Sequence, residues 1–277
     1  MHDLTEVHQL TLSLAKVFIK LCEKHGLRYY FIGGSVIGIL RHGGFIPWDD
    51  DIDIGMPRKD YDRLLEILQT DMPEGYGICN RHTDKDWHFN LSQFVDLESE
   101  LLIHLAEKPR KAHVWLDIFP LDGLPTGKLS RYLHVQNILL HRYLVQIAHI
   151  ATQVDAHRKR PLLENLILGF CKVIPVGKLI KTDRVLDRME KLLRKYDYDD
   201  SIYVGNMLGR QRAHEVVLRE QFGTPVQKQF EDILVNIPEK YHELQTHFYG
   251  DYMAMPPEEK RESHNVTILK ARTLPQK

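Results

Sequence analysis

Apolar positions near the N-terminus recur at steps of three and four residues, which is the period of an amphipathic helix. The pattern ends near Gly26, a residue type suited to ending a helix. The next stretch, RYYFIGG (28–34), is aromatic and β-branched and closes on a glycine pair, as a strand entering a tight turn does. The apolar helical positions are Leu4, Val7, Leu10, Leu14, Val17, Phe18 and Leu21.

The period changes several times between residues 35 and 125. SVIGILRHGG (35–44) predicts a short helix, and in DIDIG (51–55) acid and isoleucine alternate, so that on a strand the acids share one face and the isoleucines the other. A helical period returns in PRKDYDRLLEILQ (57–69). Four strand-like runs follow: GYGIC, FNLSQFVDL, ELLIHL and HVWLDIFPL. The first half therefore predicts an α/β (α+β) fold, with a mixed sheet and flanking helices.

The pattern becomes mainly helical after DGLPTG (122–127). Helical periods cover roughly 128–153, 161–172 and 178–196, and the remainder holds the strand-like SIYVGN, a strand in QFEDILVNIP, a helix in EKYHELQTHFYG and a polar tail. We predict three parts: a core over 1–125, a helical region over 126–200, and a segment over 201–277 that packs back on the core.

Composition narrows the class of protein. The chain of 277 residues has a formal net charge of −1, which gives no general attraction to nucleic acid, so we expect no nucleic-acid partner. Three widely spaced cysteines predict reduced thiols. The absence of a long apolar run predicts a soluble cytoplasmic protein without a signal peptide. Residues 108–160 carry nine Lys or Arg against three Asp or Glu. This basic region is either a solvated face or a contact to the inner, anionic face of a membrane.

Four aspartates lie within five positions, 49 to 53, directly beside the predicted buried strand. Like charges beside a core need either good solvation or a cation. Asp51 and Asp53 would hold Mg²⁺ (or Mn²⁺) through oxygen ligands, and Asp117, between apolar neighbours on another strand, is the preferred third carboxylate over Asp96. A solvated loop or a calcium site remains the simpler alternative.

The turn Gly33-Gly34-Ser35 precedes a helix, so its backbone amides could approach a phosphate closely. Together with the aspartates, this arrangement is typical of sites for metal-chelated phosphate esters.

The stretch FIGGSVIGILRHGGFIPWDDDIDIGMPRKDYDRL (31–64) resembles the signature of the LicD family of phosphotransferases, whose relatives include fukutin. WLDIFPLDGLP (115–125) and YGDYMAMPPEEKRESH (249–264) resemble later blocks of the same family. The resemblance implies a nucleotidyltransferase-like fold. It also implies transfer of phosphocholine from CDP-choline to a sugar hydroxyl of a cell-surface glycan, which is a teichoic acid or lipopolysaccharide precursor. The acceptor is then either a glycan or a lipid-linked glycan.

The resemblance also implies roles for individual residues. Asp51, Asp53 and Asp117 would be metal ligands, with Asp49 or Asp50 orienting them, and Asp117 would accept the proton of the attacking hydroxyl. The nucleotide phosphates would contact Gly33, Gly34 and Ser35, while other bordering groups would offset phosphate charge or pair with the aspartates: Arg41, His42, and Arg58 or Lys59.

Several alternatives stay open at this point. His264 is a second candidate base, Trp48 either packs the turn or stacks on a base, and the donor is CDP-choline, CDP-glycerol or CDP-ribitol. A true nucleotidyltransferase and a non-catalytic metal or nucleotide binder are the other function classes. A choline head group needs an aromatic cage; its candidates are Tyr196, Tyr198, Tyr203, Tyr241, Phe248, Tyr249 and Tyr252.

Overall fold

The computed structural model describes residues 4–104, 109–149, 180–261 and 266–274. Its helices are α1 (Thr5–His25), α2 (Gly33–His42), α3 (Arg58–Ile67), α4 (Lys128–Ala148), α8 (Thr182–Leu193), α9 (Arg219–Phe222) and α10 (Tyr241–Tyr249). Its strands are β1 (Tyr30–Phe31), β2 (Asp53–Pro57), β3 (Tyr76–Cys79), β4 (Ser92–Ile103), β5 (Arg110–Leu124), β6 (Tyr203–Gly205), β7 (Val216–Leu218), β8 (Val226–Phe230), β9 (Ile233–Ile237) and β10 (Val266–Lys270).

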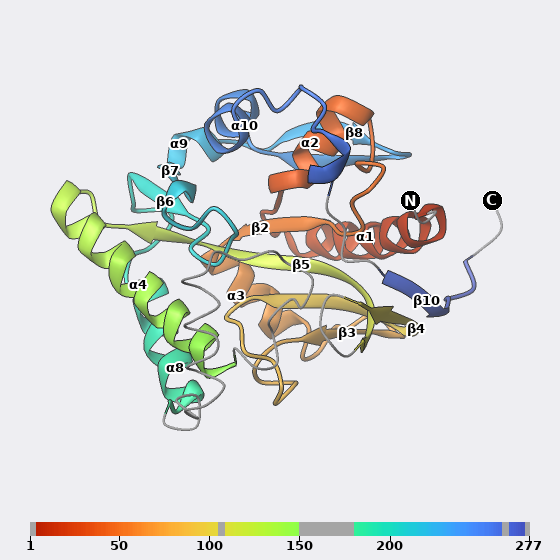
Figure 1. Cartoon of the computed structure of the whole chain (residues 1–277), viewed down its shortest axis with the longest axis horizontal. Helices are drawn as coiled ribbons and strands as arrows, with labels where there is room; N and C mark the ends of the chain where they lie inside the picture. Colours follow the sequence, from red (N-terminus) through yellow and green to blue (C-terminus); the bar gives the residue numbers. More distant parts are fainter. Residues whose placement is uncertain (1–3, 105–108, 150–179, 262–265, 275–277) are drawn as a thin grey trace.

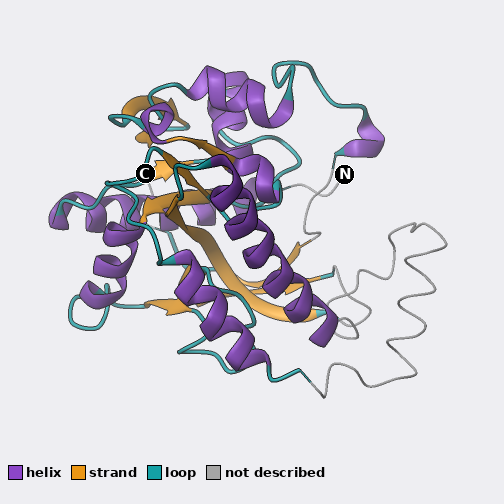
Figure 2. Ribbon diagram, turned by 90° about the vertical axis from the view of Figure 1, so that its left-hand side faces the viewer, coloured by secondary structure: helices purple, strands orange, loops and turns teal. Residues whose placement is uncertain are grey.

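The main sheet is built on two long strands, β4 and β5, and its strand order is β1-β2-β5-β4-β10. β2 and β5 are parallel, and the other pairs are antiparallel. β3 and β10 pair with successive halves of the outer edge of β4, and β6 extends the sheet from the end of β5. The strands pass through the middle of the molecule, with helices on either side (Figure 2). The prediction of a mixed-sheet α/β (α+β) fold is confirmed.

The core lies between the sheet and α1, whose apolar face is buried as its period predicts. Phe18 of α1 packs at 5.8 Å from Phe94 of β4 and is fully buried. Gly26 ends α1 in the left-handed conformation (φ 61°), which a glycine adopts without steric cost. A second, smaller core joins α4 to α8, and Figure 1 shows these two helices at one end of the sheet.

The structure corrects two predicted strands. FNLSQFVDL and ELLIHL are one continuous strand, β4, whose register shifts between Asp96 and Leu101, so the interruption in the pattern is a bulge and not a turn. QFEDILVNIP is not a single strand but parts of two, because the chain reverses at Glu231, which has a φ of 51°. The helical period over 161–172 lies outside the described residues.

The C-terminal residues return to the core, since β6 pairs with β5 and β10 with β4. The division into three parts stays a prediction. Cys22 is buried and Cys79 half-buried, both free, while Cys171 lies outside the described residues. Within the described ranges, no helix is long and apolar enough to cross a membrane.

Candidate metal and phosphate site

Three carboxylates meet where β2 and β5 run side by side. Asp53 is directly opposite Asp117 in the parallel register, and Asp51 lies two residues before Asp53. One oxygen from each of the three lies within 4.8 Å of the others. Asp49, Asp50 and Asp51 form a second trio by the same measure, so the acids are contiguous. We call Asp49, Asp51, Asp53 and Asp117 the acidic cluster.

The burial of two isoleucines decides which way the acids face. Ile52 and Ile54 are 1% and 0% exposed, so alternation turns Asp51 and Asp53 to the opposite face, where both are half-buried. β2 begins at Asp53, and Asp51 belongs to the segment just before it, but the backbone N–H of Asp117 already donates to Ile52 O at 3.1 Å. The parallel pairing therefore extends to the residue between the two acids.

The start of α2 closes against the same acids. Gly33 has a φ of 58°, and a Cβ there would lie 3.2 Å from Asp53 Oδ2. A Cβ on Gly34 would lie 3.0 Å from Asp49 Oδ2. Since the first amides of a helix are unpaired, this glycine pair presents N–H donors beside the acidic cluster. Ser35 ties α2 to β2, because its Oγ accepts a hydrogen bond from Asp53 N at 2.9 Å.

Two side chains hold Asp117 in place. Gln93 Nε2 donates to its Oδ1 at 2.8 Å, and Trp115 Nε1 donates to its Oδ2 at 3.0 Å. Gln93 lies opposite Asp117 on β4. Sequence reasoning missed Gln93, and the one signal for it is a polar residue next to Phe94 in a strand-like run.

The carboxylates of the acidic cluster repel one another, so a bound cation would stabilise the cluster. The pKa of Asp53 is raised well above its usual range, first by burial and then by the charges of Asp51, Asp117 and Asp49. A hard divalent cation bound by oxygen ligands removes both the repulsion and the need for protonation. The carboxylate donor set, with oxygens within 4.8 Å of one another, fits Mg²⁺ or Mn²⁺.

Two further residues reach this site from the C-terminal third of the chain. The hydroxyl of Tyr249, at the end of α10, lies 3.5 Å from the position of a Cβ on Gly33. Burial, and then the charges of Asp53, Glu215 and Asp49, raise the pKa of Tyr249, so its phenol stays protonated. Tyr249 was predicted only as one of several cage aromatics. Glu215, in the 3₁₀ turn Arg212–Glu215, was not predicted at all.

Glu215 leads to a prediction about pH. Burial raises its pKa to about 7, while the Gln211 N–H and the charge of Arg142 oppose the shift. A raised folded-state pKa contributes stability below the unfolded value near 4.5, and this contribution is lost as the pH rises through about 7. In metal-free buffer, Glu215→Gln should therefore be more stable than the parent at pH 8, by about 1 kcal/mol or a few degrees in Tm, and equal to it near pH 5.

Thermal unfolding at both pH values checks this expectation. Glutamine keeps the acceptor for the 2.9 Å bond from Gln211 N, so the comparison isolates the charge. The exposed Glu74→Gln is the control, with no pH-dependent difference expected. A difference between Glu215→Gln and the parent that does not change with pH would contradict the prediction.

Arg41 and His42 lie at the other end of α2, where they meet the C-terminal segment. Arg41 Nη1 donates to the carbonyls of Tyr252 (3.1 Å) and Ala254 (3.0 Å), and its Nε donates to His42. Burial lowers the pKa of His42. Trp48 lies against the same group, 5.8 Å from the Arg41 guanidinium carbon. Their contacts therefore tie α2 to the C-terminal segment, and a role in donor binding stays a prediction.

Arg58 and Lys59 are not brought to the acidic cluster. Five residues of extended strand, roughly 16 Å, separate Arg58 from Asp53. Arg58 is buried and bonds Asp122 through Nε (2.7 Å) and Nη2 (2.8 Å), and Glu190 through Nη1 (3.1 Å). Lys59 pairs with Asp197 at 2.7 Å on the surface. The structure pairs these two residues with Asp122, Glu190 and Asp197 and not with the cluster aspartates, while contact with the donor phosphates stays a prediction.

The rival third acid, Asp96, is buried and paired with Arg272 at 2.8 Å, so it is committed elsewhere. His264 lies outside the described residues. Four of the candidate cage aromatics have other partners: Tyr196 meets His134 edge-to-face, Tyr198 meets Phe222 edge-to-face, Tyr203 lies against the Arg131 guanidinium, and Tyr252 lies tilted against His242. Tyr249 is the candidate whose hydroxyl faces the cluster.

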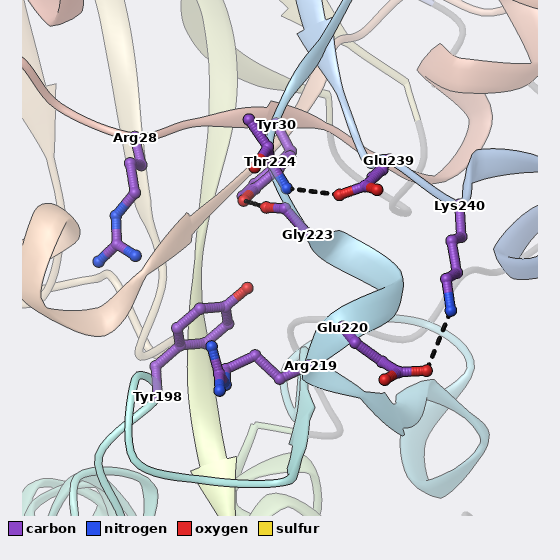
Figure 3. A pocket seen from close by; sticks show the side chains of 9 residues that line it. All are labelled: Arg28, Tyr30, Tyr198, Arg219, Glu220, Gly223, Thr224, Glu239 and Lys240. Carbon is purple, nitrogen blue, oxygen red and sulfur yellow. Dashed lines mark hydrogen bonds and ion pairs between the residues drawn. The ribbon is translucent and has the colours of Figure 1, made fainter.

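A cavity of about 470 Å³ is lined by none of the cluster residues. Figure 3 shows its lining: Arg28, Tyr30, Tyr198, Arg219, Glu220, Gly223, Thr224, Glu239 and Lys240. Within this lining, Lys240 pairs with Glu220 at 3.0 Å, while Arg28 pairs with Asp60 and Asp199 outside it, each at 2.7 Å. The carboxylates that could hold a cation lie apart from this cavity, at the acidic cluster.

Comparison with known proteins assigns the chain to a family. The family model described as LicD/FKTN/FKRP, nucleotidyltransferase domain, matches residues 26–137, which include the whole acidic cluster. The lipopolysaccharide cholinephosphotransferase LicD of Haemophilus influenzae is 30% identical over 271 residues, covering 95% of this chain and 96% of that protein.

Shorter matches cover less than half of the chain. An uncharacterized protein of Rickettsia prowazekii is 37% identical over 113 residues, or 41% of this chain and 39% of its own length. The human ribitol 5-phosphate transferase FKRP is 44% identical over 46 residues, 17% of this chain and 9% of that protein. The predicted resemblance, and with it the prediction of an enzyme of the transferase class, is confirmed. The chain belongs to the LicD family of phosphotransferases.

Proposed function

We propose that the protein transfers phosphocholine from CDP-choline to a sugar hydroxyl of a cell-surface glycan, in a reaction that depends on a divalent metal. The observation that supports this most is the acidic cluster itself. Three carboxylates from neighbouring strands converge within 4.8 Å, next to the glycine-rich start of α2. The near full-length relative named as a lipopolysaccharide cholinephosphotransferase supports choline as the alcohol and a lipopolysaccharide-type acceptor over teichoic acid.

In this proposal, Asp51, Asp53 and Asp117 hold Mg²⁺ or Mn²⁺, which when bound neutralises charge on the donor diphosphate. The amides of Gly33 and Gly34, in the first turn of α2, would face the donor phosphates, because the first amides of a helix have no partner within the helix. The acceptor oxygen forms a bond to the phosphorus that carries choline, the bond from that phosphorus to CMP breaks, and CMP leaves. The proton of the acceptor hydroxyl passes to a carboxylate.

Asp117 is the carboxylate we assign to that proton. Gln93 and Trp115 hold both of its oxygens in fixed positions, as a base in a set geometry requires. Asp117→Asn should therefore lower kcat by about 10²- to 10³-fold with the fold intact, measured by CMP release in steady state. Unchanged turnover would remove the assignment. Gln93→Glu, which repels Asp117 without removing it, should give a smaller loss and shift the pH profile of kcat to higher pH.

A related donor is the second candidate, because the name of the human FKRP relative gives ribitol 5-phosphate as the group transferred. CDP-ribitol and CDP-glycerol would use the same phosphate and metal contacts and differ only at the alcohol. A nucleotidyltransferase releasing pyrophosphate and a non-catalytic binder are the remaining alternatives.

Calorimetry separates these possibilities. CDP-choline, CDP-glycerol and CDP-ribitol are titrated with and without Mg²⁺, and products are identified after adding acceptor. We expect metal-dependent binding of CDP-choline with the highest affinity, and CMP as the released nucleotide. Preference for another CDP-alcohol would reassign the donor, pyrophosphate would indicate nucleotidyl transfer, and binding without turnover would indicate a binder. A cytoplasmic location stays a prediction.

A further inference from the structure

One face of α4 exposes a stripe of apolar side chains, interrupted by the exposed Gln136. At 100° per residue, its positions fall within about a third of the helix circumference. Leu129 is 71% exposed and Leu133 58%, although leucine is normally buried. The stripe, hereafter the outer face of α4, consists of Leu129, Tyr132, Leu133, Leu140 and Tyr143, each at least 45% exposed.

The opposite face of α4 is already used for packing. Val135, Ile138 and Val145 are buried against Leu186 and Met189 of α8. The outer face is therefore not a misplaced core face, since the helix has a complete packing surface of its own. Figure 1 shows α4 along the margin of the molecule. An apolar stripe of this extent on a folded surface marks an interaction site.

The charges around the stripe favour an anionic partner. α4 has no acidic residue in its 21 positions, and the exposed Lys128 lies at its start. Arg212 lies at the other end, where its Nη1 donates to the hydroxyl of Tyr143 at 2.5 Å and its guanidinium carbon lies 5.1 Å from the ring centroid. A second copy of the same face would bring these like charges together, which opposes self-association.

The combination of leucines, exposed tyrosines and flanking cations matches helices that lie in a bilayer interface. Tyrosine is favoured at the headgroup level, leucine reaches the acyl boundary, and basic residues attract anionic headgroups. A helix of 21 residues lying flat offers about 30 Å of contact. We propose that the outer face of α4 docks the protein on the surface of a bilayer containing anionic phospholipid.

The same helix also contacts the loop that leads to Glu215. Arg142, on its inner side, donates to the carbonyls of Met207 (2.7 Å) and Gly209 (3.0 Å), just before the turn that carries Glu215. Docking through α4 would therefore bring the bilayer to the helix that holds this loop, and the charge of Glu215 acts on Asp53 of the acidic cluster.

The test is co-flotation of the full-length protein with vesicles, without donor or metal, so that its result does not depend on the proposed chemistry. The vesicles are phosphatidylcholine alone or phosphatidylcholine with phosphatidylglycerol. We expect partitioning to the anionic vesicles to exceed that to neutral vesicles by about tenfold and to weaken as NaCl is raised. L129E/L133E should lower it by about tenfold or more.

The matched control is L234E/L269E, which adds the same charge at exposed leucines of β9 and β10 and should partition like the parent. Where L129E/L133E lowers the Tm, the milder Tyr132→Ser, Tyr143→Ser variant replaces it, with a smaller loss of partitioning expected. No flotation of the parent, or equal flotation of parent and stripe variants, would overturn the proposal. So would a concentration-dependent dimer in light scattering that L129E/L133E abolishes, because a second copy would then cover the stripe.

Discussion

The double variant Asp51→Asn, Asp53→Asn is expected to lose metal-dependent donor binding and to lower turnover by roughly 10³-fold or more. Asparagine keeps the shape of aspartate but removes the charge that holds a divalent cation. Because Asp53 faces Asp117 in register and Asp51 lies two residues away, the substitution removes two of the three converging carboxylates. Isothermal titration with Mn²⁺, then with the CDP-alcohol, measures the loss.

The same variant should be more stable than the parent when no metal is present. Burial and the neighbouring carboxylates disfavour the ionised form of Asp53, so removing two charges relieves repulsion in the folded state. We expect a gain of about 1 kcal/mol or more, a few degrees in Tm, in EDTA at pH 7.5. Adding Mg²⁺ should raise the Tm of the parent and leave that of the variant unchanged.

Asp86→Asn, Asp200→Asn removes the same charge from exposed positions and serves as the control for both experiments. It should keep turnover and show the metal-induced rise in Tm. Equal Tm shifts with Mg²⁺ in the parent and in the cluster variant would show that the cation binds elsewhere.

The acidic cluster was accessible from sequence because its information is local. Alternation of acid with isoleucine sets the facing of Asp51 and Asp53, and burial of Ile52 and Ile54 enforces it. Asp117 could be preferred because a carboxylate between apolar neighbours in a strand needs a partner. The pairing of Asp53 with Asp117 itself is a register between strands more than sixty residues apart, which no local pattern contains.

The residues that sequence reasoning missed depend on such distant contacts. Gln93 reaches Asp117 through the register of β4 with β5. Tyr249 and Glu215 come from α10 and a short turn that return to the start of α2. Likewise, the reversal at Glu231 has no glycine to announce it, so the hairpin of β8 and β9 was predicted as one strand.

Arg58 shows the opposite failure, in which nearness along the chain suggested nearness in space. The residue follows the cluster by five positions, and on a compact loop it would border the same site. β2 is extended, however, and carries Arg58 to its far end, where it meets Asp122 and Glu190. Both partners are distant in sequence, so only the fold could identify the interaction.

Arg58→Met should therefore destabilise the protein strongly, by about 3–5 kcal/mol, or roughly 10 °C in Tm. Arg58 is 6% exposed and Asp122 1% exposed, so the variant would leave the Asp122 carboxylate buried without its cation. Burial raises the pKa of Asp122 to about 6, and the charge and hydrogen bonds of Arg58 oppose this shift. Chemical denaturation at pH 7.5 measures the change in the free energy of unfolding.

Two further variants distinguish this structural role from the donor-binding role suggested by sequence. Arg58→Met combined with Asp122→Asn should recover part of the lost stability, because no charge is then stranded between β5 and α3. Lys59→Met, which removes an exposed ion pair with Asp197, should leave the stability nearly unchanged. If Arg58 instead bound the donor, Arg58→Met would keep its Tm and lose affinity for the CDP-alcohol. We expect the first result because every nitrogen of the Arg58 guanidinium is bonded. Nε and Nη2 donate to Asp122 and Nη1 donates to Glu190, so no edge of the guanidinium is left for a phosphate.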